Sequence, residues 1–380
     1  MSAGRLTIVL AASNWTSGKR RTLRRFIKAG VASALHWTGA DAVIGAISGV
    51  RQLPVVFGYH RVVDDFAAHR ERSIPPMLVS RRMFERHLDW IGRRFRFASL
   101  DEIGARLASG RGFRTPVAGV TFDDGYRDVY EHAFPLLVRK GIPATIFVVT
   151  DWVGQQRPLP HDWLYLLLCQ TWPRAREVIA GRAVSVSEHR TARALSDPFS
   201  ALRLMLTTRT HARVAAVIAA LEAETTIDDG ARNGLQPLTW EMLLEMRRAG
   251  LTIGSHTKTH TVLTRESRTR ALEETVGSRR ALEERLGAPI DHFAYPDGAF
   301  NAEAVDAVAA AGYHFAYTTC RHQPGRHPLL TIPRRPLWES TCLDAAGRFS
   351  PAIASCLTNG VFDLVVGCGK RHGAPAAMAA

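Results

Sequence analysis

Between residues 54 and 318 the chain alternates between short apolar runs and longer segments in which apolar positions recur at helical spacing. The longer segments predict amphipathic helices at residues 80–95, 130–139, 241–249, 265–286 and 302–311. The short runs are rich in β-branched and aromatic residues and predict buried strands at residues 55–59, 117–122, 144–149, 251–255, 292–295 and 314–318. Strands separated by helices favour βα units around a parallel sheet, and seven or eight such units are enough to close a barrel.

The stretch 157–236 interrupts this alternation. It is rich in Ala, Leu and Arg and contains no run typical of a strand, so we expect a helical insertion between two barrel units. The barrel itself is expected over residues 54–345. Residues 1–53 predict a basic, helical N-terminal segment, and residues 346–380 predict a C-terminal extension that ends in a disordered tail.

Two polar clusters directly follow predicted strands. Asp123 and Asp124 stand in the segment TFDDGY, and His256 and His260 stand in the segment SHTKTH. Taken alone, the first cluster also fits an Asp-Gly turn that caps a helix. Histidines four residues apart lie on one face of a helical turn and can reach the same ion. Because the strand ends of a barrel share one edge, an aspartate and two histidines there predict a metal site with open positions for water or substrate.

The pairing of TFDDGY with SHTKTH, in this order on a β/α chain, resembles the NodB-type polysaccharide deacetylases, which form carbohydrate esterase family four. The resemblance covers roughly residues 54–340 outside the insertion. It implies a distorted (β/α) barrel with a divalent metal, usually zinc, that removes N-acetyl groups from N-acetylglucosamine polymers or chitooligosaccharides. Carried over by position, Asp123 resembles the catalytic base, and the metal ligands would be Asp124, His256 and His260.

The third motif of this family falls on the segment FAYPDG, and the chain departs from the family there. Pro296 and Gly298 agree with the motif, but Ala294 stands where an arginine is usual and Asp297 where a tyrosine is usual. The resemblance nevertheless makes Tyr295, Pro296 and Asp297 candidates for substrate binding.

The family's general acid, a histidine in a late motif, is not evident around Thr331–Arg335. Tyr59 and His60, at the end of the first predicted strand, resemble a pair in deacetylases of exported poly-N-acetylglucosamine, where such a histidine lines the site. Histidine is the side chain whose ordinary pKa suits protonation of an amine near neutral pH. We therefore predict His60 as the general acid and Tyr59 as a substrate contact, with His161 as the rival acid.

Charge changes the picture at the N-terminus. The 380 residues carry a net charge of +14, and residues 1–51 hold eight Lys and Arg against one acid, Asp41, a net charge of +7. Such a segment suits an anionic membrane surface. Aromatic residues are not interleaved with the basic cluster, so no nucleic-acid partner is expected. Residues 29–50 are too polar for a spanning helix and predict a short helix that is either amphipathic or packed against the rest of the protein. No secretory signal is evident, and we expect a cytoplasmic enzyme at the inner face of the membrane.

Composition excludes a mostly disordered chain and a polytopic membrane protein, since 46% of the residues are hydrophobic and 22% are charged. Five cysteines without a CxxC pair predict neither a zinc ribbon nor a disulfide framework. Three other functions stay open. They are a cyclic amide or imide hydrolase on the same site, a glycan-binding protein that has lost turnover, and a nucleic-acid-binding protein suggested by the high pI alone. An open groove would favour a polymer as substrate, and a closed cavity a small amide.

Overall fold

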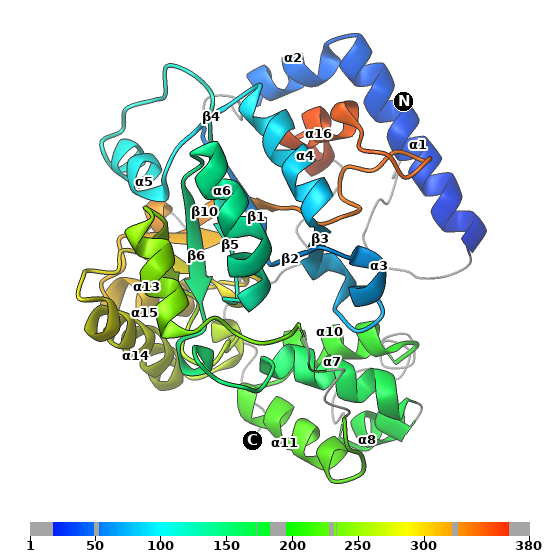
Figure 1. Cartoon of the computed structure of the whole chain (residues 1–380), viewed down its shortest axis with the longest axis vertical. Helices are drawn as coiled ribbons and strands as arrows, with labels where there is room; N and C mark the ends of the chain where they lie inside the picture. Colours follow the sequence, from blue (N-terminus) through cyan, green and yellow to red (C-terminus); the bar gives the residue numbers. More distant parts are fainter. Residues whose placement is uncertain are drawn as a thin grey trace, which may run out of the picture.

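The computed structural model describes residues 18–48, 53–172, 174–182, 195–227, 232, 234–320 and 326–364. Within this part of the chain, seven parallel strands close into a barrel in the order β1-β10-β9-β8-β7-β6-β5, and β5 pairs back to β1 (Figure 1). The barrel strands are β1 (Val55–Tyr59), β5 (Val117–Phe122), β6 (Ala144–Val148), β7 (Thr252–Ser255), β8 (His292–Ala294), β9 (Phe315–Thr318) and β10 (Ile332–Pro336). The prediction of a (β/α) barrel is therefore confirmed.

Six of the barrel strands lie within one residue of the predicted apolar runs. The seventh, β10, was not predicted, because the sequence Ile-Pro-Arg-Arg-Pro is neither apolar nor alternating. Backbone pairing holds β10 in the barrel, because it pairs with β1 on one side and with β9 on the other. Three short strands accompany the barrel: β4 (Arg96–Phe97) extends the sheet beside β5, and β2 (Arg61–Val63) pairs with β3 (Leu78–Ser80).

Helices cover the outside of the barrel, and the five predicted ones are confirmed within four residues at their ends. Ser80, Ser99, Thr239, Ser267 and Asn301 each cap a helix by accepting a hydrogen bond from a first-turn amide. The covering helices are α4 (Arg81–Gly92), α5 (Leu100–Ala108), α6 (Phe134–Lys140), α13 (Trp240–Arg248), α14 (Arg268–Leu286) and α15 (Ala302–Ala310). A π-helical turn, η3 (Val129–Ala133), precedes α6.

Four helices with their own apolar core lie between β6 and α13, at the bottom of Figure 1. They are α7 (Pro160–Thr171), α8 (Arg174–Arg182), α10 (Pro198–Thr208) and α11 (His211–Glu222), and we call them the helical insertion. Leu164, Leu167, Leu202 and Leu221 are buried among them. Short helical turns elsewhere are η2 (Pro75–Met77), α3 (Phe66–His69), η4 (Thr150–Trp152), η5 (Leu263–Arg265), η6 (Pro296–Gly298), η7 (Pro328–Leu330) and η8 (Val361–Leu364).

The two ends of the described chain pack together on one side of the barrel (Figure 1). Helices α1 (Gly18–Trp37) and α2 (Ala40–Ile47) contact α16 (Pro351–Thr358). No described helix is long and apolar enough to cross a membrane. The predicted disordered tail lies outside the described residues, as do residues 365–380 as a whole.

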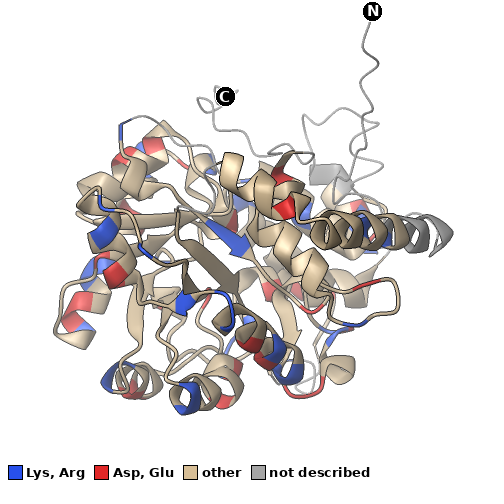
Figure 2. Cartoon of the chain, turned by 90° about the horizontal axis from the view of Figure 1, so that it is seen from above, with Lys and Arg blue, Asp and Glu red and all other residues tan. Residues whose placement is uncertain are grey.

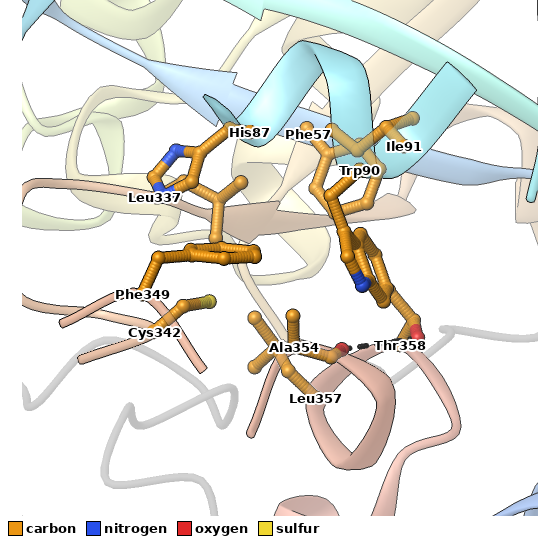
Figure 3. Close-up of a pocket in the computed structure, with 10 residues that line it drawn as sticks. All are labelled: Phe57, His87, Trp90, Ile91, Leu337, Cys342, Phe349, Ala354, Leu357 and Thr358. Atoms are coloured by element: carbon orange, nitrogen blue, oxygen red, sulfur yellow. Dashed lines mark hydrogen bonds between the residues drawn. The ribbon is translucent and has the colours of Figure 1, made fainter. Parts of the chain in front are cut away.

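A small apolar cavity lies between α4, α16 and the segment after β10 (Figure 3). Phe57, His87, Trp90 and Phe349 are among the residues that line it. It offers about 10 Å³ for the centre of a water molecule, which is room for at most one. The cavity is therefore a packing defect and not a ligand site.

Arg61 on β2 is a buried arginine outside the site that forms hydrogen bonds with three separate parts of the chain. The side chain is 1% exposed; its Nε donates to Asp128 at 2.7 Å, Nη1 donates to Ser73 at 2.7 Å, and Nη2 donates to the Gly234 carbonyl. One guanidinium thus joins the barrel, the loop before β3 and the chain that leaves the helical insertion.

We predict that Arg61→Met lowers the free energy of unfolding by about 3–5 kcal/mol, because Asp128 would stay buried without its partner. Urea unfolding measures the change. The matched control is Arg280→Met, which breaks an exposed pair with Glu284 and should cost less than about 1 kcal/mol. Equal losses in the two variants would contradict this role for Arg61.

Candidate metal centre

The two predicted clusters meet at the carboxyl end of the barrel. Asp124 follows β5, and His256 and His260 follow β7; one ligand atom from each lies within 4.8 Å of those of the others. The Oδ1 atom of Asp124 is 3.4 Å from His256 Nε2 and 3.1 Å from His260 Nε2. The structure therefore assembles the Asp-His-His set that the sequence pattern predicts.

Both loops that carry these residues hold strained backbone. Asp124, Thr257 and His260 have φ values of 71°, 69° and 59°, in the left-handed region that non-glycine residues seldom occupy. Such conformations cost about 1–3 kcal/mol each and persist where the surrounding structure imposes them. Two backbone hydrogen bonds help to impose them, from Asp123 N to Tyr59 O and from His256 N to Val148 O, both 2.9 Å.

The tautomer of His256 is set by its second ring nitrogen. Nδ1 lies 2.8 Å from the carbonyl oxygen of Ala294 and must donate to it, so Nε2 of the neutral ring carries a lone pair. Burial lowers the pKa of His256 to about 4, despite the opposing effect of the two aspartates, so the ring is neutral near pH 7. An unprotonated nitrogen therefore faces a carboxylate oxygen at 3.4 Å, an arrangement in which both atoms can bind one divalent cation.

Asp124 is buried and ionised. Burial by itself would raise its pKa, but His260 above all, with His161 and His60, holds the pKa well below its usual range. Within the described chain, neither carboxylate oxygen receives a well-aligned hydrogen bond. A buried carboxylate in this condition is costly unless it is paired or bound to a metal. One carboxylate and two imidazoles with open positions are a donor set that suits a divalent metal such as Zn²⁺.

Asp123 is held apart from this set by Arg334, a residue that sequence reasoning missed. Nη1 and Nη2 of Arg334 donate to the two carboxylate oxygens of Asp123 at 2.6 and 2.7 Å. Burial would raise the pKa of Asp123, but Arg334 and His256 outweigh it and lower the pKa. Arg334 comes from β10, so the guanidinium absent at Ala294 is supplied by another strand. One feature of the sequence could have indicated Arg334. The barrel needs one more strand to close, and an arginine on such a strand needs a buried acidic partner.

The helical insertion also reaches the centre. His161 at the start of α7 lies with Nε2 3.8 Å from Asp124 Oδ2, and its ring centroid is 4.4 Å from that of His260. The hydroxyl of Tyr126 donates to Asp162 at 2.5 Å and accepts from His161 Nε2 at 2.8 Å. Burial lowers the pKa of His161 to about 3, so this ring is neutral near pH 7. The sequence offered His161 only as a rival acid, and the hydrogen bonds to Tyr126 and Asp162 could not be foreseen.

His60 directly follows β1, where the carbonyl of Tyr59 accepts a hydrogen bond from Asp123 N at 2.9 Å, so it lies at the same strand ends as both aspartates. Tyr59, in contrast, is fully buried outside the centre, where its ring packs on Phe84 and Phe122. Alternate residues of a strand face opposite sides, and Tyr59 faces α4. The contact of Tyr59 with substrate stays a prediction.

Tyr295 is also buried, and its contact with substrate stays a prediction. Its side chain is fully buried beside Phe293 and Phe300, and its hydroxyl donates to the carbonyl of Leu330. Pro296 is buried in the same turn, whereas Asp297 is exposed with a φ of 55°. Contacts of Pro296 and Asp297 with substrate stay a prediction.

Comparison with known proteins agrees with this geometry. Residues 110–316, more than half of the chain, match the family model named polysaccharide deacetylase. The chain belongs to the polysaccharide deacetylase family.

Two curated relatives share shorter stretches. The Bacillus subtilis protein YxkH is 28% identical over 95 residues, which are 25% of this chain and 34% of YxkH. Poly-beta-1,6-N-acetyl-D-glucosamine N-deacetylase of Staphylococcus aureus is 30% identical over 112 residues, 27% of this chain and 38% of that enzyme. The chain thus aligns with little more than a third of the length of these relatives.

The fold resembles that of a solved structure. IcaB from Ammonifex degensii superposes with a TM-score of 0.51 at 21% sequence identity, over 81% of this chain and 97% of IcaB. The likeness supports the barrel fold.

We predict that the purified protein binds one divalent metal ion per chain and that Asp124→Ala, His256→Ala and His260→Ala each lower the affinity for Zn²⁺ by more than about 100-fold. Loss of an outer partner of a ligand already costs about 10- to 100-fold. Isothermal titration with Zn²⁺ measures the affinity, and His314→Ala, at a side chain 68% exposed, is the control. Retention of wild-type affinity in any of the three variants would remove that residue from the site.

Proposed function

We propose that the protein is a metal-dependent hydrolase that removes N-acetyl groups from an N-acetylglucosamine glycan. The observation that carries the proposal is the division of labour between adjacent carboxylates. Asp124 faces two imidazoles, while Asp123 is turned to Arg334. A hydrolase that attacks an amide with water needs both a site for the metal and a base that the metal does not bind. The Staphylococcus aureus relative, whose name states poly-N-acetylglucosamine as its substrate, supports this glycan class.

The roles of the side chains follow from their positions. A divalent metal held by Asp124, His256 and His260 would lower the pKa of a water molecule and polarise the acetyl carbonyl. Asp123 takes one proton from the attacking water as the new C–O bond forms at the carbonyl carbon. Arg334 keeps Asp123 ionised and fixes the orientation of its carboxylate through two hydrogen bonds. The carbon–nitrogen bond then breaks, and the products are acetate and a free amine on the sugar.

We assign the proton for the leaving amine to His60. It stands at the end of β1, next to the strand that carries both aspartates, and it is half-buried. Histidine is the side chain whose ordinary pKa suits the transfer of a proton to an amine near neutral pH. His161 is the less suitable acid, because its low pKa keeps it unprotonated near pH 7.

A groove of about 410 Å³ between the chain after β6 and the helical insertion favours a polymer over a small cyclic amide. Trp152 and Trp163 line it together with Arg157, Glu222 and other polar residues. Backbone hydrogen bonds from Thr150 and Asp151 tie its wall to the loop between His256 and His260. Indole rings beside charged and amide groups suit a pyranose, which offers both C–H faces and hydroxyls. The proposal places the part of the glycan beyond the reacting sugar in this groove.

Turnover is favoured over a glycan-binding protein that has lost its activity. Lost turnover was suggested by two departures from the family motif, Ala294 in place of an arginine and Asp297 in place of a tyrosine. Arg334 now supplies a guanidinium to Asp123, so the base keeps a charged partner.

We predict that the protein releases acetate from N-acetylglucosamine oligosaccharides and that Asp123→Asn lowers kcat by about two to four orders of magnitude, the usual effect of losing acid–base help. The variant should keep its bound metal, because Asp123 is not a ligand in this account. Acetate release and metal content, measured on the same preparation, test both statements. Loss of metal from Asp123→Asn would mean that the two aspartates have exchanged roles.

We predict that Trp152→Ala lowers kcat/KM for a hexasaccharide by about 2- to 10-fold, the effect expected for one lost aromatic contact, and leaves the disaccharide unaffected. Trp37→Ala, at a tryptophan on α1 that is 89% exposed, is the matched control. Equal effects of Trp152→Ala on both chain lengths would exclude the groove from glycan binding.

A further inference from the structure

Large hydrophobic side chains exposed on this protein are concentrated on one part of it. The described residues include ten such side chains, and seven of them belong to α1, α2 and the chain just beyond, namely Phe26, Ile27, Val31, Trp37, Val43, Ile47 and Leu53. Trp37 is 89% and Ile47 is 83% exposed. Large apolar side chains that are exposed in one part of a soluble domain indicate a binding surface. We call these seven residues the apolar face.

The helices that carry the apolar face are fixed to the body of the protein by their other side. Ala32 on α1 is fully buried against α16, in a cluster with Ile353 and Cys356. Asp41 on α2 accepts hydrogen bonds from Ser355 at 2.5 Å and from Asn359 at 3.2 Å. The buried side already has its partner, so the apolar face is a second, outward surface and not an unsatisfied core.

Charge indicates what this surface contacts. The sequence of α1 contains Lys19, Arg20, Arg21, Arg24 and Arg25 and no acidic residue. The sixth basic residue of α1, Lys28, is half-buried and donates to the carbonyl of Thr341 at 3.0 Å, so it belongs to the packed side of the helix. On the helices around the barrel, by contrast, basic and acidic residues are interspersed (Figure 2). A basic helix with exposed Phe, Ile and Trp side chains has the character of helices that lie in the interface of anionic membranes. Each Lys or Arg near such a surface contributes about 1 kcal/mol, and tryptophan prefers the level of the lipid headgroups.

We propose that α1 and α2 dock the protein on an anionic phospholipid bilayer, with the apolar face in the headgroup region and the rest of the chain outside the membrane. A second copy of this chain is a poorer binding partner for the apolar face, because residues 1–51 of each copy carry a net charge of +7 and would repel each other. The helical insertion beside the metal centre lies at the far end of the molecule from α2 (Figure 1). Docking through α1 and α2 therefore leaves the catalytic edge uncovered.

Co-sedimentation of the full chain with vesicles tests the proposal. We expect binding to vesicles of phosphatidylcholine with 30 mol% phosphatidylglycerol, about tenfold or more weaker binding to pure phosphatidylcholine, and weakening by 0.5 M salt. The double variant Trp37→Glu/Ile47→Glu should lose at least tenfold in vesicle affinity. The matched control is Val138→Glu/Val276→Glu, which places the same two charges on α6 and α14, at side chains 52% and 46% exposed. This control should bind as the wild type does.

Two results would overturn the proposal. One is equal vesicle binding by the wild type and Trp37→Glu/Ile47→Glu. The other is a dimer, found by size-exclusion chromatography with light scattering, that this double variant abolishes while the wild type ignores vesicles. Acetate release from a soluble oligosaccharide, measured alongside, should be the same in all three proteins. If none of the proteins releases acetate, the proposed deacetylation is contradicted. The vesicle measurements would then still test membrane docking separately.

Discussion

The buried ion pair between Arg334 and Asp123 links the closure of the barrel to the chemistry of its edge. Arg334 stands on the strand that closes the ring between β9 and β1, and both of its terminal nitrogens reach the Asp123 carboxylate. Two charges at such burial are tolerated only as a well-hydrogen-bonded pair. With Asp123 committed to Arg334, only Asp124 of the two adjacent carboxylates is left to face His256 and His260.

The remaining features of the site support Asp124. Its left-handed backbone turns the carboxylate toward the histidines, and the hydrogen bond from His256 to Ala294 directs an unprotonated nitrogen at it. The helical insertion closes the other side with His161, which is held by Tyr126. Three segments far apart in sequence therefore converge on one carboxylate. Such convergence is what allows a strained, desolvated centre to persist.

The sequence alone was sufficient to predict those features of the fold and the site that depend on local residue patterns. Apolar runs located six barrel strands, and the DD and HxxxH motifs at two strand ends located the Asp-His-His set, because parallel strands bring their ends to a common edge. It was insufficient for features that depend on contacts between distant parts of the chain. β10 has neither an apolar run nor alternation, so Arg334 could not be assigned to the barrel. The direction of the Tyr59 side chain depends on the packing of α4 against β1, which no local pattern contains.

Anomalous diffraction at the zinc edge, from crystals of the wild-type protein grown with Zn²⁺, would show directly which aspartate binds the metal. We expect one strong peak about 2.0–2.2 Å from a carboxylate oxygen of Asp124 and from Nε2 of His256 and His260. Asp123 should remain paired with Arg334 in the same crystals. A peak bound to Asp123, or an Asp123 carboxylate that has left Arg334 to bind the metal, would contradict the division of roles between the two aspartates.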